Sequence, residues 1–148
     1  MKSSGFSLLE VLVATTIMVV GVAALAQLAA LAARANRTAH TTTVAAVLAQ
    51  QKMEQLRALG LSPSPAGALG QNTTGYCDFV DGNGRVLGGG TTPPPGAVYI
   101  RRWSVEPLPA SPNDTLVLQV LVTRSRTGGA TRLPDDVRLV SVKTRKAS

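Results

Sequence analysis

The chain contains little of what most metal sites and enzymes require. Among its 148 residues Cys77 is the single cysteine, so no disulfide can form within the chain. The one histidine, His40, has no cysteine or second histidine beside it, which leaves a zinc site without support. Aromatic residues make up only 3% of the chain, whereas 45% is hydrophobic. This apolar content excludes ordinary intrinsic disorder, because disordered chains are poor in hydrophobic residues.

Charge is absent from one long stretch near the N-terminus. Residues 11–33 contain no ionisable side chain, and no proline precedes Pro63. A helix over this stretch rises about 35 Å, enough to cross a hydrocarbon core of about 30 Å. The stretch therefore predicts a membrane-spanning helix. A cleaved secretory signal is the alternative, although its apolar run is usually only about 7–15 residues long.

An acidic residue interrupts this apolar segment near its start. Glu10 is the only ionisable side chain between Phe6 and Ala33. A carboxylate inside a membrane segment is costly and indicates a functional site with a cationic partner. The next cation, Arg34, lies about 36 Å further along a helix that rises about 1.5 Å per residue. The partner must therefore come from another chain or from a newly made N-terminus, which indicates assembly.

Residues 2–14, KSSGFSLLEVLVA, resemble the processing signal of type IV pilins and type II secretion pseudopilins. The shared pattern is a short basic leader ending in Gly5, then Phe6, then an apolar run with Glu10 at its fifth position. The resemblance implies that a prepilin peptidase cuts between Gly5 and Phe6 and N-methylates the new Phe6 amine. It also implies that Glu10 docks the subunit by pairing with the N-terminus of a neighbour.

The helix is expected to continue beyond the apolar run. Residues 34–59 contain neither glycine nor proline, and Gly60 is a plausible C-cap. Apolar residues spaced by three and four form an amphipathic stripe, which predicts a helix face packed on the chain's own sheet. The stripe consists of Ala46, Ala49, Met53 and Leu56, with Leu48 and Leu59 nearby, and it leaves Gln51, Lys52 and Arg57 outside.

The remainder of the chain has the pattern of short strands. We expect strands at residues 76–80, 85–87, 97–106, 115–124 and 137–145, the first two joined by a turn at residues 81–84. Short linkers favour antiparallel pairing. The predicted fold is α+β: a long N-terminal spine helix, transmembrane in its first half and amphipathic in its second, packed against a small C-terminal antiparallel sheet.

This fold gives four expected regions. They are a leader of residues 1–5, a transmembrane and assembly half-helix of residues 6–33, an amphipathic half-helix of residues 34–59 and a β-rich head of residues 60–148. The resemblance implies a single-pass protein of the bacterial inner membrane, with a cytoplasmic N-terminus and a periplasmic head, that later enters a pilus or pseudopilus. Its implied partners are prepilin peptidase, other pilins or pseudopilins, the inner-membrane assembly platform and membrane lipid.

Within the resembling family, the sequence favours a minor subunit. Major pilins often carry proline at about the twenty-second mature residue, where this chain has Gln27. The segment from Arg101 to Val105 also resembles minor pilins of the PilV kind. We therefore predict a minor pilin of a type IV pilus, with a minor pseudopilin of type II secretion as the alternative. A DNA-binding competence pilin and an ordinary secreted β-domain are the further alternatives.

Other candidate sites have simpler interpretations. Asp78, Asp81 and Asn83 lack the spacing and closing glutamate of a calcium loop, so a hairpin turn is preferred. We expect His40 to face solvent and Cys77 to be buried and inert. Asn72 begins a glycosylation sequon, a motif that is frequent by chance. No nucleophile, P-loop or paired-carboxylate motif appears, so the sequence predicts no enzyme, cofactor or metal.

The net charge of +7 could indicate a partner of negative charge. Most basic residues belong to the head, at Arg101, Arg102, Arg124, Arg126, Arg132, Arg138, Lys143, Arg145 and Lys146. A basic surface attracts nucleic acid nonspecifically. However, few aromatic residues are available to stack on bases, so we interpret the charge as solvated and nucleic acid as a disfavoured partner.

Overall fold

A computed structural model describes residues 7–59, 62–125 and 136–144. The elements are α1 (Leu8–Ala58), β1 (Cys77–Val80), β2 (Val86–Gly89), β3 (Tyr99–Leu108), β4 (Ser111–Arg124) and β5 (Val137–Thr144). The chain divides into two compact units, one ending at Ala39 and the other beginning at His40. The observed fold is α+β, as predicted.

The first unit contains the N-terminal part of α1. The helix begins directly after Ser7, whose carbonyl accepts hydrogen bonds from the amides of Glu10 and Val11. The hydroxyls of Thr15 and Thr16 donate to the Leu12 carbonyl at 2.9 and 2.8 Å, so these polar groups are satisfied inside the helix. Every described residue from Ser7 to Ala39 is exposed. By length and composition α1 could cross a membrane, a test that a signal sequence also passes.

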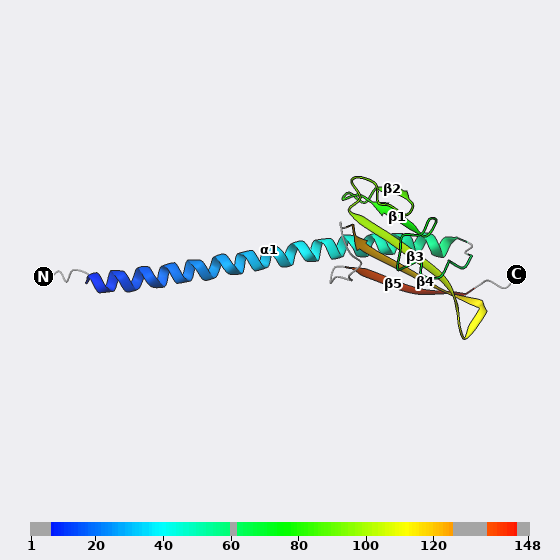
Figure 1. The fold of residues 1–148 in the computed structure, drawn as a ribbon. Coiled ribbons are helices and arrows are strands. Elements are labelled where there is room, and N and C mark those ends of the chain that lie inside the picture. The colour runs from blue at the N-terminus through cyan, green and yellow to red at the C-terminus, as the bar shows by residue number, and fades with distance from the viewer. Residues whose placement is uncertain (1–6, 60–61, 126–135, 145–148) are drawn as a thin grey trace. The chain divides into compact units, whose positions relative to one another are not determined.

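The second unit is built around a five-stranded sheet in the order β2-β1-β3-β4-β5 (Figure 1). All four neighbouring pairs are antiparallel, which confirms the prediction from the short linkers. The fourth strand is longer than the predicted residues 115–124. It begins at Ser111, because a tight hairpin pairs Ser111 with Leu108.

The core lies between the inner face of the sheet and the C-terminal part of α1, which Figure 1 shows running along the sheet. Alternate residues of β3 and β4 supply most of the sheet side of this core. They are Tyr99, Trp103 and Val105 from β3 and Leu116, Leu118, Val120 and Val122 from β4. Both strands therefore place an apolar face against the helix.

The helix contributes a stripe that differs slightly from the predicted one. Its buried residues are Ala45, Leu48, Ala49, Met53 and Leu56. Ala46 is only half-buried and Leu59 is exposed, because the face turned to the sheet begins with Ala45 and α1 ends at Ala58. The expected C-cap, Gly60, lies outside the described residues.

The outer face of the sheet carries a second, smaller apolar cluster. Cys77, Phe79 and Ile100 are buried there, with Ala97 packed against them. The burial predicted for Cys77 is thus confirmed. Gly89 of β2 lies close to β1, since a Cβ at Gly89 would be 2.7 Å from the Cys77 carbonyl oxygen. Glycine allows β2 to extend beyond the predicted residues 85–87.

The predicted turn between the first two strands is confirmed. One oxygen of the Asp81 carboxylate accepts the backbone amides of Asn83 and Arg85, both at 2.9 Å. Gly84 adopts a φ of 84°, a left-handed conformation that costs glycine little. Asp81 is therefore occupied in shaping the turn, as expected from the interpretation of residues 81–84 as a hairpin.

Candidate functional site

Glu10 lies in the first turn of α1 and is exposed. Its carboxylate is close to the positive end of the helix dipole, which favours a negative charge. Within the described residues it has no ion-pair or hydrogen-bond partner for its side chain. Gly5 and Phe6 lie outside the described residues, so the cleavage bond, the methylated amine and the docking role of Glu10 remain predictions.

The surroundings of Glu10 are apolar and face outward. Large aliphatic side chains are exposed on every side of this part of the helix. They include Leu8, Leu9, Val11, Leu12, Val13, Ile17, Met18, Val19 and Val20. A continuous apolar surface of this kind marks a site of contact with membrane or with other proteins.

A second polar site lies inside the head, where a buried ion pair joins β1 and β3. Asp78 and Arg101 are directly opposite each other in the antiparallel register. The Arg101 guanidinium donates from Nε to Asp78 Oδ1 and from Nη2 to Asp78 Oδ2, both at 2.8 Å. Arg101 is only 1% exposed, so this bidentate geometry balances a charge that is removed from water.

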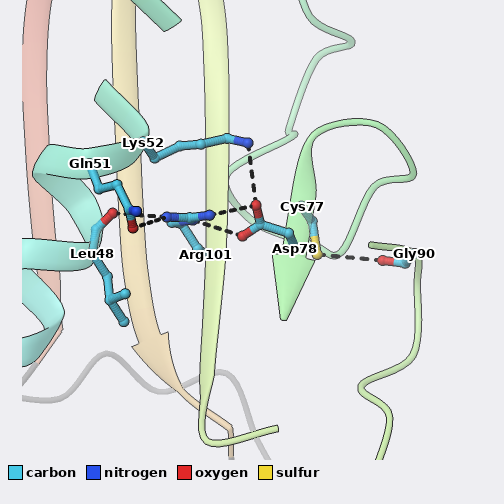
Figure 2. A network of polar contacts seen from close by, with 7 residues as sticks. All are labelled: Leu48, Gln51, Lys52, Cys77, Asp78, Gly90 and Arg101. Atoms are coloured by element: carbon cyan, nitrogen blue, oxygen red, sulfur yellow. Dashed lines mark hydrogen bonds and ion pairs between the residues drawn. The ribbon is translucent and has the colours of Figure 1, made fainter. Parts of the chain in front are cut away.

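The helix completes this network from the other side of the core (Figure 2). Arg101 Nη1 donates to the Leu48 carbonyl at 3.2 Å and to Gln51 Oε1 at 3.5 Å. Lys52 Nζ donates to Asp78 Oδ2 at 3.3 Å and lies 3.5 Å from the centroid of the Trp103 ring. Burial lowers the pKa of Lys52, although attraction to Asp78 acts in the opposite direction.

This network corrects two sequence predictions. Lys52 was expected outside the packed face, yet its side chain is only 14% exposed because its ammonium reaches Asp78 and the Trp103 ring. Arg101 was counted among the solvated charges of the head but is buried. The burial of Arg101 could have been predicted from its position on the apolar face of β3, since a charge on such a face requires a buried partner.

The C-terminal end of α1 is held by β5. Lys143 Nζ donates to the carbonyls of Arg57 and Leu59 at 2.7 and 2.6 Å. Arg57 in turn donates from Nη2 to the Ser141 hydroxyl at 2.8 Å and from Nη1 to Glu54 at 2.9 Å. A cation therefore binds free helix carbonyls at the negative end of the dipole, where it is most favourable.

The remaining candidates have structural roles or none. His40 is exposed, as predicted. The Asn72 side chain donates to the Thr91 carbonyl at 2.9 Å and accepts from Arg102 Nε at 2.8 Å. The Cys77 thiol donates to the Gly90 carbonyl at 3.4 Å, and burial raises its pKa. In the described part of the chain, no group of three or more histidine, cysteine, aspartate or glutamate residues could hold a metal ion.

Comparison with protein families covers Glu10 but not the buried network around Arg101. Residues 1–26 match the family model described as the prokaryotic N-terminal methylation motif. The chain carries a prepilin signal. This signal supports a protein of the type IV pilin or pseudopilin family and implies processing by prepilin peptidase and assembly with other pilins. Comparison with the curated proteins and with the solved structures gave no significant match.

The prepilin signal also bears on the exposed part of the helix. With the apolar part of α1 it fits a membrane-anchored pilin, and it indicates a structural subunit rather than an enzyme. The matched residues include Glu10 but end well before Lys52, so the buried network of the head lies outside the matched region.

Proposed function

We propose that this protein is a minor pilin, a structural and assembly subunit of a type IV pilus. In this proposal prepilin peptidase cleaves between Gly5 and Phe6, the Phe6 amine is methylated, and the subunit enters the filament through its N-terminal helix. Glu10 is the docking carboxylate. The observation that carries the proposal is the prepilin signal on a helix whose described residues up to Ala39 are all exposed.

A carboxylate in an apolar segment requires a cation, and within the described residues Glu10 has none. A new α-amine on Phe6 of a neighbouring subunit supplies that charge. The same packing covers the exposed aliphatic residues, which are unfavourable in water. Docking of one subunit on the next therefore satisfies the charge and the apolar surface together.

The proposed topology follows from the same elements. The protein starts as a single-pass protein of the bacterial inner membrane, with its N-terminus in the cytoplasm and its head in the periplasm. It then moves into the filament through the inner-membrane assembly platform. Its proposed domains are the leader of residues 1–5, the assembly half-helix of residues 6–33, the amphipathic half-helix of residues 34–59 and the head of residues 60–148.

A minor pseudopilin of type II secretion is the alternative within the same machinery. Deletion of the protein separates the two roles: loss of pili supports the minor pilin, whereas retained pili with loss of a secreted protein supports the pseudopilin. A competence pilin that binds DNA is less favoured, because Arg101 is buried and paired with Asp78 and adds nothing to a basic surface.

Two substitutions test processing and docking separately. Gly5→Ala should block maturation, and mass analysis of the N-terminus should then find the leader still attached. Glu10→Ala should give a normal methylated Phe6 start but little protein in sheared filaments. The matched control is Glu54→Ala, which removes an exposed acid from the head half of α1 and should leave both measurements unchanged. A mature chain beginning after Ala30 would instead support secretion by signal peptidase.

A further inference from the structure

The contact between α1 and the sheet could slide along the helix axis if apolar packing alone held it. A shift of four residues would put Val44 in the place of Leu48, and Ala45 in the place of Ala49. It would also replace Met53 by Ala49. All of these residues are apolar, and the shift amounts to one turn, about 6 Å. At these three positions the shift therefore changes side-chain volume but not polarity, although it also puts Thr41 in the place of Ala45.

The ion pair on the sheet does not depend on the helix. Asp78 and Arg101 face each other across β1 and β3, and both of the short hydrogen bonds of the pair are made within the sheet. Nor does the Leu48 carbonyl distinguish registers, since a shift of one turn would present the Val44 carbonyl instead. Apart from its 3.5 Å contact with Gln51 Oε1, which Val47 could not replace after the shift, Arg101 thus anchors a helix here without specifying which turn lies there.

Lys52 is different because its charge belongs to one position on the helix. Its ammonium lies 3.3 Å from Asp78 Oδ2 (Figure 2). It also lies 3.5 Å from the centroid of the Trp103 ring. After a shift of one turn, Leu48 would face the Asp78 carboxylate and Lys52 would occupy the position of Leu56, which is 3% exposed. An unpaired ammonium in such an apolar position is strongly unfavourable.

We propose that Lys52 sets the register of α1 on the sheet, so that the ammonium, the Asp78–Arg101 pair and the Trp103 ring together select one turn of the helix. A single buried polar residue selects one register in other helical assemblies at a cost in stability. The lowered pKa of Lys52 agrees with such a cost, because its surroundings disfavour the charged form.

This role of Lys52 does not depend on the proposed pilin function. In a pilin, however, it would fix where along the helix the head is attached. A filament subunit is held through the N-terminal part of its helix, so the register of the head on the same helix decides at which height the head is carried. One turn of error corresponds to a step of about 6 Å along the helix. Selecting the register in the folded subunit would prevent that error before assembly.

Distances between spin labels test the proposal on the full-length chain in detergent, with Cys77→Ala removing the native thiol. One label is attached at Gln55→Cys, an exposed helix position. The other is attached near either end of β4, at Asp114→Cys or at Arg124→Cys, both exposed. A helix that slides along the sheet moves the first label relative to the two ends of β4 in opposite senses, so the two distances change with opposite signs.

With Lys52 present, each label pair should give one distance. In Lys52→Leu a second population should appear, with one distance longer and the other shorter by several ångströms. Lys52→Arg keeps the cation and should restore the single distance. Gln50→Leu adds the same apolar residue at an exposed position of the helix and should change nothing.

Two results would overturn the proposal. One is an unchanged single distance for both label pairs in a folded Lys52→Leu protein. The other is loss of the head's fold in Lys52→Leu and also in Lys52→Met, whose straight side chain matches the lysine stem more closely. That loss would show that Lys52 supplies stability rather than register.

Discussion

The two parts of α1 have the same helical geometry and opposite surroundings. Leu25, in the N-terminal part, is 67% exposed, whereas Leu48, in the C-terminal part, is 4% exposed. The second part packs on strands that the same chain provides, whereas every described residue of the first part is exposed. The difference teaches that helix formation and burial are separate problems in this protein. Within the described residues of α1, burial by the chain itself begins at Ala45, and under the proposed function membrane lipid and neighbouring subunits cover the part before it.

The largest expected effect comes from breaking the buried network. Arg101→Met leaves the buried Asp78 carboxylate with Lys52 alone and should lower the free energy of unfolding of the head by about 3–5 kcal/mol. Urea denaturation followed by circular dichroism measures this loss. Arg124→Met removes a cation from an exposed site and should change stability by less than about 0.5 kcal/mol. A similar loss in both variants would contradict the assigned role of Arg101.

The next effect tests the comparison between buried and exposed leucines directly. Leu118, at the centre of the core, is 0% exposed, so Leu118→Ala should cost the head about 2–5 kcal/mol. Leu25→Ala makes the same chemical change in the exposed part of α1 and should leave unfolding of the head unchanged. The two parts of the helix would not be separate if Leu25→Ala also destabilised the head.

A smaller effect is expected where β5 holds the end of the helix. Lys143→Met removes the donor to the carbonyls of Arg57 and Leu59, and should lower stability by about 1 kcal/mol. Arg138→Met is the matched control, because Arg138 lies on the same strand, is exposed, and donates to Gln119 instead. Equal losses of stability in the two variants would contradict a specific role of Lys143 in capping the helix.

The smallest expected effect is a change in the stability of the head with pH in the alkaline range. The pKa of Lys52 is lowered in the folded head, so the unfolded chain binds more protons between that pKa and the ordinary value of about 10.4. Stability should therefore rise with pH through this interval. The raised pKa of Cys77 has the opposite sign, since its contribution is lost as pH rises through the folded pKa.

The measurement compares two proteins that both carry Cys77→Ala, which removes the thiol's contribution. One retains Lys52 and the other carries Lys52→Met. Urea denaturation at a series of alkaline pH values should show a steeper rise in the protein that retains Lys52. Parallel curves would show that Lys52 has its ordinary pKa in the folded head.

Much of the fold could be predicted because it rests on local patterns. The long uncharged apolar run predicted the first half of the helix, and periodicity with the absence of glycine and proline from residues 34–59 predicted the second half. The turn at residues 81–84 predicted the first hairpin. Lys52 could not be placed in the same way, since a helical pattern assigns a charged residue to the solvent side. Its partner Asp78 is 26 residues away and faces it only once β1 is aligned with the helix. Long-range pairing of this kind is not visible in residue spacing.

The prepilin signal was predictable for a different reason. The motif that matches the family model lies within residues 1–26, so the spacing of Gly5, Phe6 and Glu10 along the chain carries it without help from the fold. The fold in turn adds little to this site, because within the described residues no ion pair reaches the Glu10 carboxylate. The head shows the reverse case, where Arg101 acquires its role only after folding.

One consequence of the buried network concerns how the folded protein can be observed. Trp103 is the single tryptophan of the chain, and its ring lies 3.5 Å from the Lys52 ammonium. Indole emission responds to nearby charge, so the fluorescence spectrum of the unlabelled protein reports whether that ammonium is in place. The same optical signal can follow the subunit from detergent into an assembled fibre, provided that its companion subunits carry no tryptophan.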